Sequence, residues 1–439
     1  MRLIVFSFVA FIGLSRLSAD EPQRPTKPLF RDFIGINGHT VSFKPELYSP
    51  VCRLVRDYHP MEWDTGKDSN YKLDFPFARN RVNWEQVYGS WKNHGFKTDA
   101  CIMFETLQAD QWNDIPKDAY LYGKRFAESF GPSAKLPLVE AVEIGNEPGK
   151  YDDATYRKVF ENMSRGFRDG DPKLLVATCN VNVGKSGDYH KSVQCVEGLN
   201  SSYDVLNIHS YAMLEPWPTW KRSYPEDPAL AAFMQDIDAL IRWRDVHAQG
   251  KQVWLTEFGW DASTQSPASE GDFAKWQGND DVQQAQWLVR SFFLFATRDL
   301  QRAYIYFFND EDEAKFHASS GLTRSFKPKP SYFAVSHLHK TLADYRFSRI
   351  VQGGVGEPHV YEFLHESEAS QAIWVAWMPT GDSQTKKLLL SLENHRLLGV
   401  EEMPLNSLPV DSRMMPLVEG KIDIEVKETP IYLFLKRDF

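Results

Sequence analysis

Two glutamates stand near the ends of strand-like segments in this chain of 439 residues. The apolar run 138–146 leads directly into Asn146, Glu147 and Pro148, and the run 252–260 reads QVWLTEFGW, which contains Glu257. Burying an ionised carboxylate is costly unless the group is paired or used in chemistry. Two carboxylates brought to one edge of a fold can act as a general acid and a nucleophile, so the elements that carry them decide the interpretation.

Strand-like and helix-like segments alternate along most of the chain. Strands are expected over 30–37, 52–59, 98–104, 138–146, 174–181, 203–212, 252–260 and 302–310, and helices over 82–95, 152–170, 227–250, 281–299 and 329–346. This alternation predicts parallel strands joined by crossover helices. Eight such strands favour an α/β fold of the (β/α)8 TIM-barrel type over residues 29–346. A doubly wound sheet is the alternative, because periodicity alone does not separate the two.

The pattern changes in residues 347–439. Short stretches of alternating apolar and polar residues, rich in β-branched and aromatic side chains, are separated there by Gly, Pro and Asn. Such spacing is typical of antiparallel strands joined by turns. We therefore expect a C-terminal β-sandwich domain after the barrel.

The N-terminus has the pattern of an export signal. Arg2 is followed by the apolar run 3–14 and by a small-residue site near Ala19, so residues 1–19 are predicted to be a signal peptide. A membrane anchor would need about 20 apolar residues, and this run is shorter. The expected location is secreted or periplasmic, with no stable membrane insertion.

Charge and cysteine content exclude several classes of function. The balance of 50 Lys and Arg against 59 Asp and Glu gives a net charge of -9, and no basic run argues for a nucleic-acid partner. The four cysteines are too few and too scattered for a disulfide framework; a Cys179–Cys195 bridge and buried free thiols are both compatible with the spacing. The acidic run 310–313 could attract a cation, but a solvated loop is the commoner explanation. We expect no metal and no cofactor.

The active site of a TIM barrel lies at the C-terminal ends of its strands. Arg56 and Asn37 lie near the ends of the second and first predicted strands. His209 and Tyr211 alternate along the sixth, so both should point into the barrel. Arg56 could keep Glu257 ionised, although pairing with the adjacent Asp57 is the structural alternative, and a buried His209 with satisfied hydrogen bonds is common in any core.

Paired glutamates at one edge of a barrel match the requirement of a retaining glycosidase. One carboxyl donates a proton to the leaving oxygen and the other attacks the anomeric carbon, with the two groups about 5–5.5 Å apart. Two neighbouring carboxylates do not both ionise easily, so one of the pair tends to hold a proton near neutral pH.

The strings GNEP at the fourth strand and TEFGW at the seventh resemble glycoside hydrolases of clan A, and family 39 is the nearest family. The resemblance covers about residues 29–346. It implies that Glu147 is the acid/base, that Glu257 is the nucleophile and that Asn146 binds the sugar 2-hydroxyl. Arg56, and the His209 and Tyr211 pair, also match positions that the clan uses.

One position departs from the clan. Many members place a Trp under the sugar at the end of the eighth strand, whereas this chain has Phe307, Phe308 and Asn309 there. Either Phe308 or Trp260 should replace that platform. We expect Trp260 to stack on a sugar ring.

These features predict a secreted, retaining glycoside hydrolase that cleaves O-glycosidic bonds of poly- or oligosaccharides by double displacement. The alternative is a carbohydrate-binding barrel that has lost its chemistry, and the intact pair of glutamates argues against it. A barrel enzyme acting on phosphorylated metabolites is disfavoured by the export signal and by the lack of a Gly-rich phosphate loop.

Overall fold

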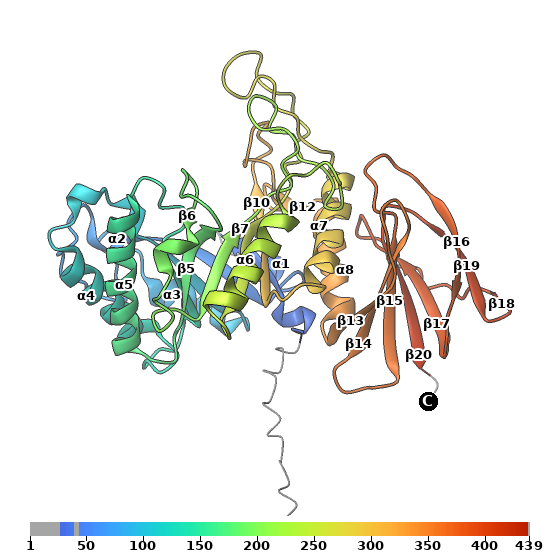
Figure 1. The fold of residues 1–439 in the computed structure, drawn as a ribbon, viewed down its shortest axis with the longest axis horizontal. Helices are drawn as coiled ribbons and strands as arrows, with labels where there is room; N and C mark the ends of the chain where they lie inside the picture. Colours follow the sequence, from blue (N-terminus) through green and yellow to red (C-terminus); the bar gives the residue numbers. More distant parts are fainter. Residues whose placement is uncertain (1–26, 39–43, 438–439) are drawn as a thin grey trace, which may run out of the picture.

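The computed structural model describes residues 27–38 and 44–437. Figure 1 shows a barrel at the left and centre, a β-rich part at the right, and a group of long loops that rises above the junction between them. The predicted signal peptide, residues 1–19, lies outside the described residues.

Eight parallel strands close into a barrel. Strand β1 pairs with β2 and with β9, and β4 pairs with both β3 and β5, so the ring of strands returns on itself. The ring contains β1 (Ile34–Gly38), β2 (Leu54–Pro60), β3 (Lys97–Met103), β4 (Ala141–Ile144), β5 (Leu175–Asn182), β7 (Val205–His209), β8 (Gln252–Phe258) and β9 (Arg302–Ile305). The expected (β/α)8 barrel is confirmed, and closure of the ring excludes the doubly wound sheet.

Helices cover the outside of the barrel, and capping residues explain where several begin. Asp152 accepts a hydrogen bond from a backbone N–H in the first turn of α5, and Asp280 forms a reciprocal capping box with Gln283 at the start of α7. The helices are α1 (Pro45–Tyr48), α2 (Met61–Thr65), α3 (Trp84–Asn93), α4 (Ile115–Phe130), α5 (Asp153–Gly170), α6 (Met234–His247), α7 (Asp281–Ala296) and α8 (Pro330–Leu342).

Two helices differ from the sequence prediction. The helix expected over 227–250 begins only at Met234, because the chain before it forms turns and Phe233 has a positive φ of 83°. Helix α4 was not predicted. Its buried Tyr122, Phe126 and Phe130 recur at the spacing of one helix face, so the signal for this helix was present in the sequence.

The chain after α8 folds into two antiparallel sheets, which confirms the C-terminal sandwich. The larger sheet has the order β13-β14-β15-β20-β17 and the smaller has the order β16-β19-β18. Their strands are β13 (Tyr345–Gln352), β14 (His359–His365), β15 (Gln371–Trp377), β16 (Lys386–Ser391), β17 (His395–Glu402), β18 (Leu417–Val418), β19 (Lys421–Val426) and β20 (Ile431–Arg437).

The larger sheet is buried on both faces. In β15, Trp374 belongs to the cluster between the two sheets, whereas Trp377 belongs to the core shared with the barrel. Helix α7 lies between this sheet and the barrel strands, and its residues from Gln284 onward are buried. Phe293 of α7 contacts the rings of Trp377 and Tyr432. The β-domain is therefore packed on the barrel through a continuous apolar core.

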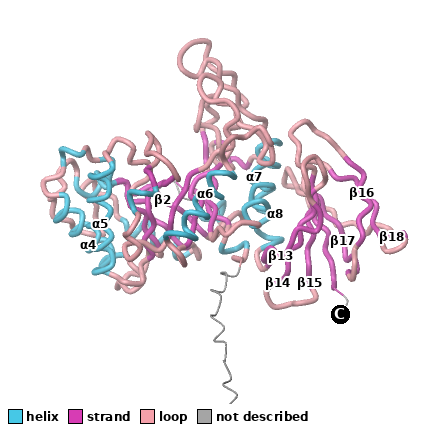
Figure 2. The backbone as a smooth tube through the Cα atoms, in the orientation of Figure 1, coloured by secondary structure: helices cyan, strands magenta, loops and turns pink. Residues whose placement is uncertain are grey.

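Three long loops follow β7, β8 and β9 and form what we call the loop tower, residues 210–233, 259–280 and 306–329 (Figure 2). Its base carries a small sheet of β10 (Asn309–Asp310), β11 (Thr323–Arg324) and β12 (Lys327–Pro328). Hydrogen bonds join the loops, such as Gln277 N–H to the Thr219 carbonyl at 2.8 Å. Because these loops start at the C-terminal ends of barrel strands, they border the region where a barrel holds its active site.

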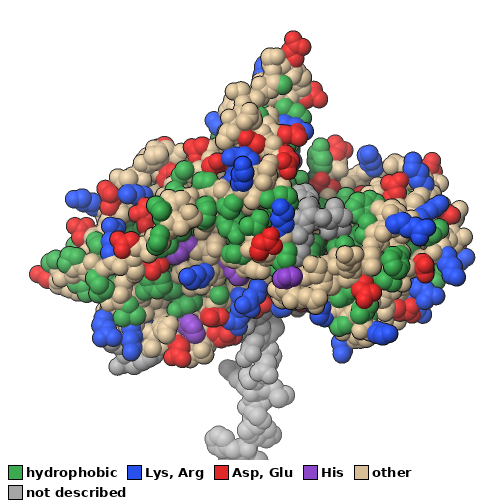
Figure 3. All heavy atoms as spheres, turned by 180° about the vertical axis from the view of Figure 1, so that it is seen from behind, with side chains coloured by type: hydrophobic (Ala, Val, Ile, Leu, Met, Phe, Trp, Pro, Cys, Tyr) green, Lys and Arg blue, Asp and Glu red, His purple; other side chains and the backbone are tan. Residues whose placement is uncertain are grey.

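The cysteines, the hydropathy of the helices and the surface charge also bear on the sequence predictions. Cys52, Cys101, Cys179 and Cys195 are all free and buried, so Cys179 and Cys195 do not form a bridge. Within the described residues, no helix combines the length and the hydropathy needed to span a bilayer. On the face shown in Figure 3, basic and acidic side chains are interspersed over the barrel and the β-domain.

Candidate active site

The exit of β4 presents Glu147 on a tight turn. Gly145 has a φ of +89°, and a Cβ on it would lie 2.7 Å from the Phe104 ring, so the glycine of the GNEP string is required by both conformation and space. The turn directs the Glu147 side chain toward the barrel mouth, where 26% of it is exposed. Oε1 of Glu147 lies 2.9 Å from Nδ1 of His209, the last residue of β7.

A buried carboxylate holds this turn from behind. Glu105 lies in the short 3-10 helix Phe104–Thr106 that follows β3, and its Oε1 accepts the backbone N–H groups of Asn146 at 2.6 Å and Glu147 at 3.1 Å. Burial raises the pKa of Glu105 to about 7, although those backbone hydrogen bonds oppose the shift. Glu105 therefore positions the Asn146–Glu147 backbone.

The exit of β8 presents Glu257, whose side chain is only 7% exposed. Its Oε1 accepts hydrogen bonds from Tyr58 Oη at 2.6 Å and Arg56 Nη1 at 3.0 Å. Its Oε2 accepts one from Tyr211 Oη at 2.8 Å. Gly259 lets the chain pass beside β9, because a Cβ there would lie 2.4 Å from the Tyr306 carbonyl oxygen. Every oxygen of Glu257 is thus held by donors.

Arg56 connects the two exits from inside the barrel. Its guanidinium donates to Glu257, to Asn146 Oδ1 at 2.8 Å and to Asn37 Oδ1 at 2.8 Å. It also forms a two-point ion pair with Glu143, at 2.9 and 2.7 Å, in which both side chains are fully buried. A planar guanidinium with several fixed donors suits this task better than an ammonium would.

The surroundings keep Glu257 ionised. Burial alone would raise the pKa of Glu257, but the charges of His209 and Arg56 and the hydrogen bonds from Tyr58 and Tyr211 outweigh burial and lower it to about 2. Burial raises the pKa of both Tyr58 and Tyr211, so the phenols stay protonated and act as donors. The nucleophile of a double displacement needs this ionised state.

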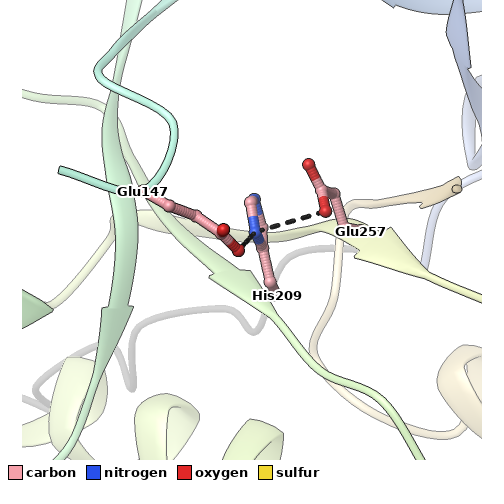
Figure 4. Close-up of side chains that lie close together, drawn as sticks. All are labelled: Glu147, His209 and Glu257. Carbon is pink, nitrogen blue, oxygen red and sulfur yellow. Dashed lines mark hydrogen bonds and ion pairs between the residues drawn. The ribbon is translucent and has the colours of Figure 1, made fainter. Parts of the chain in front are cut away.

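His209 lies between the two carboxylates, as Figure 4 shows. Its Nδ1 is 2.9 Å from Glu147 Oε1 and 3.5 Å from Glu257 Oε2. One carboxylate oxygen of Glu147, one of Glu257 and a ring nitrogen of His209 all lie within 4.8 Å of one another. The two carboxylates therefore approach each other to 4.8 Å or less. The sequence-predicted pair therefore meets across the barrel mouth.

The same three residues could offer ligands to a divalent ion. The contacts of Glu257 disfavour this use, because both of its oxygens already accept hydrogen bonds from protein donors. In the acidic run 310–313, Asp310 is paired with Lys329 and Asp312 is bound by Thr264 and Arg324. These two carboxylates are thus occupied by protein groups.

Three residues that were expected to contact a substrate are buried in the structure. Arg56 is fully buried and donates to Glu257 and Asn146. Asn37 is also fully buried, accepts a hydrogen bond from Arg56 and donates to the Thr256 carbonyl at 2.8 Å. Trp260 is also fully buried, and its indole N–H donates to the Ser223 carbonyl at 2.8 Å. The backbone turns after β8 and sends this ring outward among Phe233 and Trp287, so Trp260 is a core residue.

A different aromatic borders the site at the end of β9. Phe308, the other expected platform, is fully buried, whereas Tyr306 is partly exposed. The Tyr306 ring lies edge-on to Tyr211 with centroids 6.4 Å apart. His317 packs on Tyr211 at 4.6 Å.

The wall continues outward from Tyr211 along the loop tower. The Arg222 guanidinium lies 4.4 Å from the centre of the Tyr211 ring. Further out, Trp220 stacks on Phe316 at 4.5 Å with an interplanar angle of 17°. A series of rings therefore leads from the carboxylates into the tower.

Sequence reasoning missed Tyr58, Glu105 and Tyr306. Tyr58 had a usable signal, because it lies two residues after Arg56 on one strand and so shares its inward face. Glu105 had none, since it acts on backbone N–H groups 41 and 42 residues away in the sequence. Tyr306 was overlooked because the strand was expected to extend to 310, whereas β9 ends at Ile305.

Comparisons with known proteins place the fold. The chain superimposes on a family 39 glycoside hydrolase from the gut symbiont Bacteroides cellulosilyticus with a TM-score of 0.69 and 16% identity, covering 94% of this chain and 81% of that one. The fold is that of clan A glycoside hydrolases.

Other solved structures agree. A glucosidase from Croceicoccus marinus matches with a TM-score of 0.62 and 11% identity over 94% of this chain and 97% of its own. A family 30 subfamily 8 xylanase from Clostridium acetobutylicum matches with a TM-score of 0.58 and 10% identity, over 92% and 96%. No protein-family profile and no curated protein sequence matches the chain. Identities this low support the shared fold alone.

Proposed function

We propose that the protein is a retaining glycoside hydrolase in which Glu257 is the nucleophile and Glu147 is the acid/base. The observation that carries the proposal is the approach of Glu147 and Glu257 oxygens to within 4.8 Å, with Glu257 buried and Glu147 partly exposed. Retaining glycosidases need carboxyls about 5–5.5 Å apart, and inverting ones need about 6.5–9.5 Å to admit a water.

In the first step the Glu257 carboxylate attacks the anomeric carbon while the Glu147 carboxyl donates its proton to the glycosidic oxygen. A C–O bond to the enzyme forms, the bond to the leaving alcohol breaks, and a covalent glycosyl-enzyme results. Arg56, Tyr58 and Tyr211 hold the attacking carboxylate in one orientation, which lowers the cost of reaching the reactive geometry.

In the second step Glu147 accepts a proton from water, which attacks the same carbon and releases Glu257. His209 contacts both carboxylates and holds their relative positions from one step to the next. Arg56 occupies Oδ1 of Asn146, so the NH2 end of Asn146 is the end available to a sugar hydroxyl.

The substrate is carbohydrate, and its rings are expected against Tyr306 and the aromatic wall of the tower. Sugar faces pack on aromatic rings, and Tyr306 and Trp220 are both partly exposed. We also propose that the chain is exported after removal of residues 1–19. The binding-only alternative is excluded if the purified protein turns over any glycoside.

The direct test is the configuration of the first-formed product. Aryl β-glycosides and a panel of polysaccharides serve as substrates, and proton NMR follows the anomeric signal before mutarotation. Retention of configuration is expected. An inverted product would mean that a water acts between the carboxyls, and no turnover on the whole panel would leave the binding-only alternative.

A further inference from the structure

A pocket whose lining does not include the two carboxylates lies where the loop tower meets the β-domain. We call it the seam pocket. It has a volume of about 470 Å³ and is lined by tower residues such as Arg222 and Tyr224, by Gln283 and Trp287 of α7, and by Asp382 and Gln384 of the β15–β16 loop. This volume falls within the usual range of small-molecule sites.

The β-domain side of the seam pocket is tied to the barrel by side chains that lie outside the pocket lining. Arg290 of α7 makes a two-point ion pair with Glu226 and donates to the Thr380 carbonyl at 2.9 Å. Glu428 accepts the Thr380 hydroxyl at 2.9 Å and the Ser383 N–H at 2.7 Å. The loop at the β-domain edge is therefore tied to the barrel before any ligand arrives, which reduces the ordering cost of binding.

Two buried donors on its lining have no partner among the described residues. The indole N–H of Trp287 and the Nε–H of Arg222 make no hydrogen bond, although these residues are 3% and 2% exposed. Because both nitrogen atoms have almost no accessible surface, they do not face the pocket, and the contacts to a ligand come from the other polar groups of the lining.

The remaining lining identifies the class of ligand. Side-chain amides of Gln277, Asn279 and Gln384 both donate and accept, and the Tyr224 ring adds an apolar face. Lys221 and Asp382 carry opposite charges, and Arg222 is already paired with Asp261 at 3.4 Å. A neutral molecule rich in hydroxyl groups fits this mixture better than a phosphate or a carboxylate does.

We propose that the seam pocket binds a neutral saccharide unit at a site separate from the catalytic pair. The proposal rests on carbohydrate being the substrate class of the enzyme. Arg222 borders both places, since its guanidinium also packs on Tyr211, which donates to Glu257. One saccharide chain held here would be anchored beside the cleft while the carboxylates act on another part of it or on a neighbouring chain.

The test uses the full chain with Glu257→Gln, which cannot turn over its ligand, labelled with 5-fluorotryptophan. The Trp287 signal is assigned by its loss in Trp287→Phe, and fluorine NMR follows it during titration with cello-, xylo-, manno- and galacto-tetraose. At least one of these is expected to shift the Trp287 signal in a saturable way. Absence of any shift with all four would overturn the proposal.

Variants on the β-domain edge separate binding from folding. Asp382→Ala/Gln384→Ala changes only exposed side chains, and Asp423→Ala on β19 is the control on the other sheet. The double variant should weaken the saturable binding about tenfold with an unchanged melting temperature, a loss equal to one or two hydrogen bonds, and the control should not. Equal affinity in both variants would place the binding elsewhere and overturn the proposal.

Failure of the two proposals gives different results. If the wild-type protein hydrolyses glycosides with retention but the Trp287 signal never moves, only the seam pocket is wrong. If a tetraose binds at Trp287 and no glycoside is hydrolysed, the pocket stands and the glycosidase function is wrong.

Discussion

The exits of β8 and β4 hold their glutamates in opposite ways. At β8, Glu257 is 7% exposed and receives hydrogen bonds from Arg56, Tyr58 and Tyr211. At β4, Glu147 is 26% exposed and its carboxyl is hydrogen-bonded to His209, while Glu105 fixes only its backbone. One carboxyl is immobilised as an anion, and the other keeps access to solvent and to protons.

This difference supports the roles that we propose for the two groups. A nucleophile must be ionised and aimed at one carbon, whereas an acid/base must give up and regain a proton in each cycle. A group surrounded by fixed donors serves the first purpose and not the second. Substitutions at and around the two glutamates test this contrast.

Glu257→Gly should reduce turnover by at least about 10⁴-fold, because the attacking group is removed while its donors remain. Added azide should fill the gap and convert an aryl β-glycoside into the α-glycosyl azide. Kinetics and NMR of the product measure both effects. A near wild-type rate would show that Glu257 is not the nucleophile.

Glu147→Ala should lower kcat on unactivated glycosides by about 10²- to 10⁴-fold, the usual contribution of a general acid. The loss should be much smaller for aryl glycosides whose leaving group needs no proton. Azide should accelerate this variant too, but now by attack on the glycosyl-enzyme, giving the β-glycosyl azide. Equal losses on both kinds of leaving group would contradict the acid role.

Tyr58→Phe and Tyr211→Phe each remove one donor from Glu257, and each should lower kcat/KM by about 10- to 100-fold. The pKa of Glu257, about 2 in the native protein, should rise in both variants because a hydrogen bond that favours the anion is lost. The acid limb of the pH profile of kcat/KM should therefore move to higher pH. Tyr120→Phe is the control, because Tyr120 lies on the outer face of α4 and its hydroxyl donates to the surface residue Asp169. An unmoved acid limb would argue that these phenols do not tune Glu257.

Glu105→Gln should have the smallest effect, and it should be seen in stability. The pKa of Glu105 is about 7 in the fold and about 4.3 in an unfolded chain. Between those values the folded protein keeps a proton that the unfolded chain has lost, so this group makes stability fall as pH rises through that window.

In the Gln variant that contribution should disappear, while the amide oxygen still accepts the N–H groups of Asn146 and Glu147. Melting temperatures from pH 4.5 to pH 8 measure the slope, with the exposed Glu313→Gln as control. A variant that declines as steeply as the wild type would mean that Glu105 is not the buried titrating group.

The barrel could be predicted from the sequence because each strand carries its own signal of apolar residues and turns. Parallel strands in a barrel end at one rim, so finding Glu147 and Glu257 at strand ends was enough to predict that they lie near one another. Inward alternation likewise located His209 and Tyr211 beside the carboxylates. These features depend on local pattern and on one rule of topology.

The neighbours of each side chain, by contrast, follow from how distant segments pack together. Trp260 follows the strand that carries Glu257, yet a turn of the backbone buries it in the core, and Tyr306 from another strand borders the site instead. Glu105 reaches the turn that carries Glu147 only because β3 and β4 lie side by side. Side-chain direction after a strand ends, and contacts between segments far apart in the chain, depend on packing across the whole molecule, which no local pattern encodes.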